Sequence, residues 1–225
     1  MDGASRDLSD ELSRQYERRF AAQADYRERV WRVLVDDVFQ RYVPESGTVL
    51  ELGSGWGEFI NHVRASRRLG MDLNPASAER LDPAVRFLHQ DCAATWPLEE
   101  GELDVVFTSN FFEHLPDKAS LTRTMGEALR CLRSGGRLIC LGPNIRCIPG
   151  AYWDFWDHYL PLTEKSLTEG LELAGFVIER SLARFLPYTM ARKRNPPLWA
   201  LRWYLRIPLA WRILGRQFLV IARKP

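Results

Sequence analysis

The stretch Val49–Gly57 reads VLELGSGWG, an apolar run that ends in three alternating glycines. A short apolar run predicts a buried strand, and the glycines predict a tight loop after it. Glycine allows the backbone of such a loop to approach a ligand closely, because no side chain stands between them. The segment that follows, roughly Glu58 to Ala65, is compatible with a helix whose positive end faces the loop. We therefore expect a strand, a ligand-binding loop and a helix in this order.

A second strand and an acidic residue follow at the spacing that an adenosine site requires. Residues 68–71 form the next apolar run, and Asp72 stands at its end, 21 residues after Glu51. A carboxylate at this point accepts hydrogen bonds from both hydroxyl groups of a ribose. The dehydrogenase pattern G-x-G-x-x-G requires glycine at position 58, where Glu58 stands instead. The spacing of the glycines therefore disfavours a dinucleotide site.

Five short motifs follow one another along residues 48–183. They are Glu51–Gly57, Asp72, Gln90–Cys92, Leu103–Phe107 and Leu132–Leu138. Together they resemble the successive motifs of class I S-adenosylmethionine-dependent methyltransferases. Within that class the chain is most similar to small-molecule enzymes of the methyltransferase type 11 and ubiquinone-biosynthesis-like kinds.

The resemblance implies where the cofactor S-adenosylmethionine binds. The glycine loop would lie under its methionine part, Asp72 would bind the ribose, and Asp91 with the backbone of Cys92 would face the adenine. The residues that the resemblance assigns to cofactor binding are Glu51, Gly53, Ser54, Gly55, Gly57, Asp72, Leu73, Asp91, Cys92 and Asn110. It also implies that the final strand of the sheet is antiparallel.

Strand and helix patterns alternate along the chain, which predicts an α/β fold with a Rossmann-like, doubly wound sheet of seven mostly parallel strands. Further strands are expected at 85–88, 103–109, 137–141, 176–183 and 218–222. Helices are expected at 75–81, 118–132, 163–174 and within 9–39, where the helical spacing falls on Leu12, Tyr16, Phe20, Val30, Leu34 and Val38. We expect one domain over residues 1–225, with an N-terminal helical cap at 1–43.

Basic residues concentrate at the C-terminal end. The net charge is +2, yet eleven Lys or Arg and no acidic residue follow Glu179. Most of them lie in residues 184–216, a basic and aromatic insertion between the last two strands that is longer than an ordinary hairpin connection. Within it, Pro197 precedes a run that fits a short helix, and Pro208 ends or kinks that run. The arginines of the insertion disfavour a membrane-spanning helix.

Three roles remain open for this insertion. Residues 197–214 contact a membrane surface as a basic amphipathic helix, they pack on the domain as a lid, or their arginines hold an anionic acceptor. A nucleic acid is disfavoured as partner because no separate recognition module is apparent. Because no leader peptide is apparent, we expect a cytoplasmic protein, with the inner membrane surface as the alternative. The oligomeric state is left open.

Two histidines are candidates for the general base that methyl transfer to a hydroxyl requires. His114 follows the fourth strand, where folds of this kind bind ligands, and His158 lies beside Asp157 in an aromatic cluster after the fifth strand. Imidazole has a pKa suited to this role. Each histidine also has a structural interpretation, since His114 can shape the cofactor pocket and His158 can close an aromatic core. No metal site is expected, because no set of two acids with an Asn is apparent and the cysteines form no C-x-x-C pair.

These patterns together predict an S-adenosylmethionine-dependent methyltransferase. We expect it to methylate an oxygen of a small molecule or of a glycan or lipid-linked intermediate. An RNA methyltransferase and a relative that binds the cofactor without catalysis are the alternatives. Residues 109–112 read SNFF, where similar enzymes that methylate amide or base nitrogens carry N-P-P-Y or D-P-P-Y, and this departure disfavours such substrates.

Overall fold

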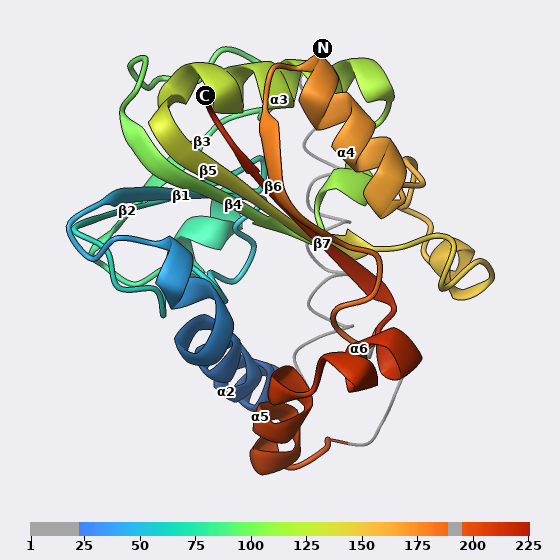
Figure 1. Cartoon of the computed structure of the whole chain (residues 1–225). Helices are drawn as coiled ribbons and strands as arrows, with labels where there is room; N and C mark the ends of the chain where they lie inside the picture. The colour runs from blue at the N-terminus through green and yellow to red at the C-terminus, as the bar shows by residue number, and fades with distance from the viewer. Residues whose placement is uncertain (1–22, 189–194) are drawn as a thin grey trace.

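The computed structural model describes residues 23–188 and 195–225, and a seven-stranded sheet forms its centre (Figure 1). The strands are β1 (Thr48–Leu52), β2 (Arg67–Asp72), β3 (Val85–His89), β4 (Leu103–Ser109), β5 (Leu132–Pro143), β6 (Val177–Leu182) and β7 (Gln217–Arg223). Their order in the sheet is β3-β2-β1-β4-β5-β7-β6. Strands β1 to β5 pair in parallel, whereas β7 runs antiparallel to both β5 and β6. The predicted seven-stranded sheet with an antiparallel last strand is confirmed.

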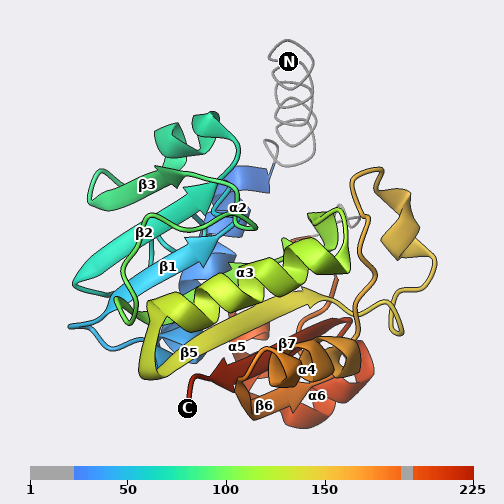
Figure 2. The same cartoon turned by 90° about the horizontal axis from the view of Figure 1, so that it is seen from above.

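Helices cover both faces of this sheet (Figures 1 and 2). One face carries α3 (Lys118–Cys131) and α4 (Glu164–Leu173), and the other carries α2 (Ala24–Leu34), α5 (Leu198–Arg206) and α6 (Pro208–Leu214). Successive residues of β1 and β5 alternate between two hydrophobic cores, because side chains of a strand point to opposite faces in turn. Burial of both faces explains why these strands read as continuous apolar runs.

The N-terminal helical region packs on the face of the sheet that α5 and α6 also cover. Helix α2 continues as a π-helical turn, Val35–Phe39, and a 3-10 turn, Gln40–Tyr42. The ring of Phe39 lies 5.0 Å from that of Phe107 in β4, and Trp31 contacts the same ring edge-on. Of the predicted stripe, Leu34 and Val38 are buried, whereas Leu12, Tyr16 and Phe20 lie outside the described residues.

The helix predicted at roughly residues 58–65 is not formed, and turns occupy most of the segment instead. Two helical hydrogen bonds are present, from the Asn61 N–H to the Gly57 carbonyl at 2.9 Å and from the Val63 N–H to the Phe59 carbonyl at 3.0 Å. Side chains occupy other backbone groups that a regular helix would pair: Glu51 accepts the N–H of Ile60 at 3.0 Å, and Arg68 donates to the Ile60 carbonyl at 3.2 Å. This competition replaces the helix. The helix predicted at 75–81 is a 3-10 helix, Pro75–Arg80.

Helices α5 and α6 form most of the described part of the insertion. Pro208 is the first residue of α6 and separates it from α5, as predicted. Leu205 of α5 is buried in the core that α2 also lines, and Arg202 pairs with Asp37 at 3.2 Å. The Tyr204 hydroxyl donates to the Phe185 carbonyl. Within the described ranges, every helix is too short or too polar to cross a bilayer.

Candidate active site

The loop Gly53–Gly57 follows β1 at the carboxyl edge of the sheet. The neighbours of β1 are β2 and β4, which lead away in opposite directions, so a crevice is expected between their carboxyl ends. The φ angles of Gly53, Gly55 and Gly57 are 64°, 47° and 71°, in a region that other residues avoid. A Cβ atom on Gly53 would overlap the ring of Phe111. The loop after β1 therefore presses against the loop after β4 at a point where only glycine fits.

Asp72 connects the end of β2 to this loop. Its Oδ2 accepts the N–H of Gly55 at 2.8 Å, and its Oδ1 accepts the N–H of Asn74 at 2.9 Å. Burial raises the pKa of Asp72, and hydrogen bonds from the backbones of Asn74, Gly55 and Leu73 and from the Ser77 side chain oppose the rise. The side chain therefore holds the loop from the position to which the sequence resemblance assigns the ribose.

Glu51 holds the loop from a buried position in β1. Its Oε2 accepts the N–H of Ile60, in the segment just beyond the glycines. Burial raises the pKa of Glu51 well above its ordinary value, and the negative charges of Glu58 and Asp72 raise it further. The structure thus gives Glu51 a contact that fixes the segment after the loop.

Two buried side-chain oxygens beside the loop have no hydrogen-bond partner in the described part of the chain: Ser54 Oγ and Asn110 Oδ1. Asn110 follows β4 and has a φ of 49°, and its Nδ2 donates to Ser109 Oγ at 3.0 Å. A buried acceptor without a donor costs about 1–3 kcal/mol. A ligand with N–H or O–H groups would remove that cost. The loop residues therefore fit the cofactor that the sequence resemblance implies.

The residues assigned to the adenine lie after β2 and β3, which are adjacent in the sheet. Leu73 is 63% exposed, and Asp91 is exposed with its Oδ1 accepting the N–H of Ala93 at 2.8 Å. Cys92 is buried, and its carbonyl accepts the indole N–H of Trp96 at 2.8 Å. Burial raises the pKa of the Cys92 thiol to about 11. Leu73 therefore offers an exposed apolar surface next to Asp72, and Cys92 is a neutral, buried thiol.

The two candidate bases, His114 and His158, lie together although they are 44 positions apart in the sequence. Their ring centroids are 5.0 Å apart. A carboxylate oxygen of Glu113 and one ring nitrogen of each histidine all lie within 4.8 Å of one another. The three residues follow the carboxyl ends of β4 and β5, which pair directly. This adjacency of the strands brings the cluster together.

Backbone carbonyls orient both rings. The Nδ1 atom of His114 lies 2.8 Å from the carbonyl oxygen of Asp157, and that of His158 lies 2.8 Å from the carbonyl oxygen of Tyr152. A carbonyl only accepts, so each neutral ring carries its hydrogen on Nδ1 and its lone pair on Nε2. The side chain of Asp157 lies beside His114, with Oδ2 3.4 Å from its Nδ1. Asp157 thus contacts the His114 ring through both its carbonyl and its carboxylate.

Glu113 is the member of this cluster that the sequence did not single out. Its side chain is buried, and burial raises its pKa to about 7. The charge of His114 opposes this rise, whereas the charge of Asp157 adds to it. The sequence feature that points to Glu113 is an acidic residue directly before His114, a few residues after a buried strand.

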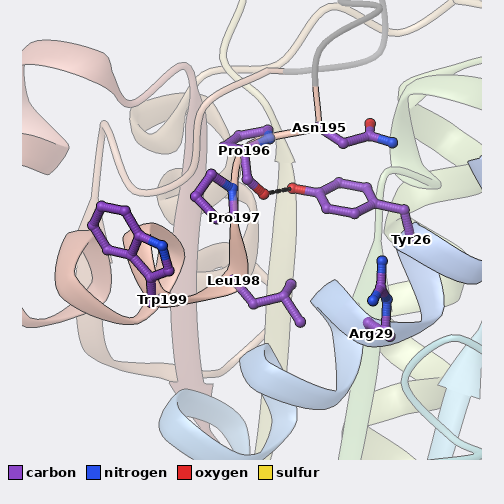
Figure 3. A pocket seen from close by; sticks show the side chains of 7 residues that line it. All are labelled: Tyr26, Arg29, Asn195, Pro196, Pro197, Leu198 and Trp199. Carbon is purple, nitrogen blue, oxygen red and sulfur yellow. Dashed lines mark hydrogen bonds between the residues drawn. The ribbon is translucent and has the colours of Figure 1, made fainter.

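A pocket of about 410 Å³ lies between α2 and the start of α5 (Figure 3). Tyr26, Arg29 and residues 195–199 line it, and the Tyr26 hydroxyl donates to the carbonyl of Pro196 at 2.7 Å. Helix α2 also reaches the glycine loop, because Arg27 pairs with Glu58 through two hydrogen bonds of 2.6 and 2.7 Å. Helix α2 thus connects the pocket to the segment after the glycines.

Known proteins share this sequence pattern. A family model described as a methyltransferase domain matches residues 23–186. A protein of Mycolicibacterium smegmatis named "Probable S-adenosylmethionine-dependent methyltransferase" is 33% identical over 168 residues, which cover 70% of this chain and 63% of that protein. The 2-methyl-6-phytyl-1,4-hydroquinone methyltransferase of Synechocystis is 26% identical over 156 residues, which cover 60% of this chain and 48% of that protein. The matched regions thus span less than two thirds of either curated relative.

Solved structures share the fold. A SAM-dependent methyltransferase of Thermotoga maritima superposes with a TM-score of 0.68 at 17% identity, and the match covers 94% of this chain and 95% of that chain. At this identity the likeness concerns the fold alone.

Proposed function

Because this chain belongs to the methyltransferase-domain family, we propose that it methylates an oxygen of a hydroxylated small molecule or of a glycan or lipid-linked intermediate. S-adenosylmethionine, when bound, supplies a methyl group on a positively charged sulfur. The observation that carries this proposal is the glycine loop, in which three residues of positive φ stand beside Asp72 and two unpaired buried oxygens.

The residues of the loop region have distinct roles in this proposal. Asp72 accepts the ribose hydroxyls at the end of β2, beside the loop that it holds through Gly55. Asn110 Oδ1 accepts a donor from the methionine part of the cofactor, which supplies its missing hydrogen bond. Leu73 offers its exposed apolar side chain to the adenine ring. Glu51 keeps the turn after the loop in place through Ile60.

We assign activation of the acceptor to the cluster of Glu113, His114 and His158. Both histidines present a lone pair on Nε2, because their Nδ1 atoms are bonded to carbonyls. The cluster follows β4 and β5, on the other side of β1 from Asp72. An acceptor hydroxyl placed there meets basic groups at the edge of the sheet where the cofactor loop also lies.

The outer faces of α5 and α6 suit an acceptor that arrives from a membrane. The exposed apolar side chains there, which we call the α5–α6 surface, are Trp199, Trp203, Ile207, Leu209, Ile213 and Leu214. Arg206 and Arg212 are exposed beside them. Exposed tryptophans with arginines match the interfacial region of an anionic bilayer. The name of the Synechocystis relative describes a hydroquinone with a phytyl chain, and we propose an acceptor of this lipid-linked phenolic class.

Acceptor screening tests the proposed reaction. The protein is incubated with S-adenosylmethionine and with prenylated phenols or hydroquinones in anionic vesicles, and mass spectrometry detects S-adenosylhomocysteine and the product. We expect an O-methylated product that wild type forms and Asp72→Asn forms at a greatly reduced rate. A product methylated on carbon or nitrogen contradicts the oxygen assignment, and failure to bind S-adenosylmethionine contradicts the proposed function itself.

Vesicle sedimentation tests the proposed membrane contact. Wild type is expected to bind vesicles with anionic lipid and to dissociate as salt rises, whereas neutral vesicles bind it weakly. The double variant Trp199→Ser/Trp203→Ser removes the two aromatic anchors and should lose most of the binding. Trp156, which is 85% exposed in a different segment, provides the matched control Trp156→Ser. Equal vesicle binding by all three proteins, or none by wild type, contradicts the contact.

A further inference from the structure

The cluster of Glu113, His114 and His158 has the composition of a metal site. We infer that these three residues bind one divalent transition-metal ion. Zinc ligands lie about 2.0–2.2 Å from the ion, so the ligand atoms of a tetrahedral site are about 3.4 Å apart. The three ligand atoms here already lie within 4.8 Å of one another. Small movements of the side chains are enough to close them around an ion.

The two histidine rings make the hydrogen bonds that are typical of metal-binding histidines. A histidine that binds a metal through one ring nitrogen donates its other N–H to a carbonyl or carboxylate, which fixes the tautomer and the ring orientation. His114 and His158 both do so through Nδ1, to the carbonyls of Asp157 and Tyr152. The Asp157 carboxylate lies 3.4 Å from the same nitrogen of His114. Both Nε2 atoms therefore have the lone pair that a metal requires.

The burial of Glu113 supports the same inference. Its side chain is 4% exposed at the centre of the cluster. A buried carboxylate is costly unless a cation or several donors compensate its charge. The nearby titratable groups are His114 from the same loop and Tyr152, Asp157 and His158 from the segment after β5. A bound divalent cation would compensate the carboxylate and use both imidazoles.

The donor set indicates which ion binds. Two imidazoles with one carboxylate suit Zn²⁺ and its first-row neighbours, whereas Mg²⁺ prefers oxygen ligands in an octahedral arrangement. Burial raises the pKa values of the thiols of Cys92 and Cys131 to about 11, so these thiols are protonated at neutral pH and compete poorly for the ion.

Three protein ligands leave one position of a tetrahedral ion open. In the proposed methyl transfer, on which this step rests, the open position takes the acceptor oxygen. The ion lowers the pKa of the acceptor hydroxyl, and the proton passes to water, which makes the oxygen a better nucleophile toward the methyl group. The acceptor class this favours is a phenol, because its hydroxyl is already more acidic than that of an alcohol.

Calorimetric titration of ZnCl₂ into chelator-treated protein, without cofactor or acceptor, tests the inference. We expect one ion per chain in wild type. Glu113→Gln should weaken Zn²⁺ binding by about tenfold or more, and the double variant His114→Ala/His158→Ala should lose the site. His62→Gln, a histidine outside the cluster, is the matched control and should bind as wild type does. MgCl₂ should give no comparable binding.

Unchanged Zn²⁺ affinity in Glu113→Gln and in the double variant would mean an adventitious ion only and would overturn the site. Titration of wild type with Co²⁺ covers the case in which a variant fails to fold. Intense visible bands without sulfur charge-transfer bands are expected, whereas charge-transfer bands would place the ion on cysteine and overturn the inference. Because neither titration uses S-adenosylmethionine, a failed metal site leaves the methyl-transfer proposal standing.

Discussion

The effect of replacing a glycine depends on its backbone conformation and on the space around it. Gly53 and Gly126 differ in the space that surrounds them. Gly53 has a φ of 64° and lies against the ring of Phe111. Gly126 lies in α3, where no atom is within 4 Å of the position that a Cβ would take. The same substitution to alanine therefore adds a clash and backbone strain at Gly53, whereas it reduces the freedom of the unfolded chain at Gly126.

Gly53→Ala is expected to lower the free energy of unfolding by about 1–3 kcal/mol and to weaken binding of S-adenosylmethionine. Gly126→Ala, as the matched control, should raise the free energy of unfolding by about 0.5–1 kcal/mol and leave binding unchanged. Urea denaturation and calorimetry measure both quantities. A Gly53→Ala protein that binds the cofactor as wild type does would show that the loop is not the cofactor site.

Asp72 combines a structural contact with a proposed contact to the ribose. Asp72→Asn keeps the size of the side chain but removes its charge and one acceptor. A hydrogen bond to a charged group contributes about 1.5–3 kcal/mol, so the affinity for S-adenosylmethionine should fall by about 10–100-fold. Calorimetry measures the dissociation constant, with Asp104→Asn as the control because Asp104 pairs with Arg133 near the starts of β4 and β5, at the opposite edge of the sheet. Equal losses in the two variants would argue against a specific role for Asp72.

Glu51 gives a prediction for pH dependence. Its pKa is raised in the folded protein above the value of about 4.3 for an unfolded glutamate. The folded state therefore binds the proton more tightly, and the resulting stability is fully present below the unfolded pKa and is lost as pH rises through the folded pKa. The variant Glu51→Gln has no such loss, because its amide stays neutral beside Glu58 and Asp72 at every pH.

Between pH 5 and 8, the free energy of unfolding of wild type should therefore fall relative to that of Glu51→Gln. Urea denaturation at several pH values gives the difference between the two proteins, in which the titrations of other groups largely cancel. A difference that stays constant with pH would contradict a raised pKa at Glu51.

At the scale of elements, the strands were predictable and the segment after the glycine loop was not. Strands buried on both faces leave continuous apolar runs, which is why β4 has the same bounds, 103–109, as the predicted strand. The helix expected at about 58–65 is absent because Glu51 and Arg68, which lie outside this segment, pair with the backbone of Ile60. A helix-compatible pattern within a segment gives no information about hydrogen-bond partners outside it.

Buried and exposed leucines of α5 and α6 differ in their contribution to stability. Leu205 is 8% exposed in the core shared with α2, whereas Leu209 at the start of α6 is 64% exposed. Leu205→Ala should lower the free energy of unfolding by about 2–5 kcal/mol, and Leu209→Ala should change it by about 0.5 kcal/mol or less. Chemical denaturation checks both. Similar effects at the two positions would contradict the docking of α5 on this core.

At the scale of the whole molecule, the sequence predicted the fold and the order of its motifs, but not the cluster after β4 and β5. The proximity of His114 and His158 depends on the path of the loop after β5, which brings the N–H groups of Tyr159 and Leu160 to the Glu113 carbonyl at 2.8 and 3.0 Å. Sequence spacing gives no measure of such a path. The exposed tryptophans of the α5–α6 surface were likewise visible only once the inward face of α5 was known.

A ligand that binds only the folded state stabilises the whole molecule. At a concentration of 100 times its dissociation constant, the gain is about 2.7 kcal/mol. S-adenosylmethionine should therefore raise the thermal midpoint of wild type in a concentration-dependent way, while NAD should not. A midpoint that stays unchanged at saturating S-adenosylmethionine would contradict binding to the native fold.

The proposed function depends on the binding of S-adenosylmethionine by the loop after β1 and Asp72. Its most direct test is a calorimetric titration of wild type with S-adenosylmethionine and, separately, with NAD. We predict that S-adenosylmethionine binds at one site per chain and that NAD gives no saturable heat. Saturable binding of NAD, or of neither compound, would contradict the assignment.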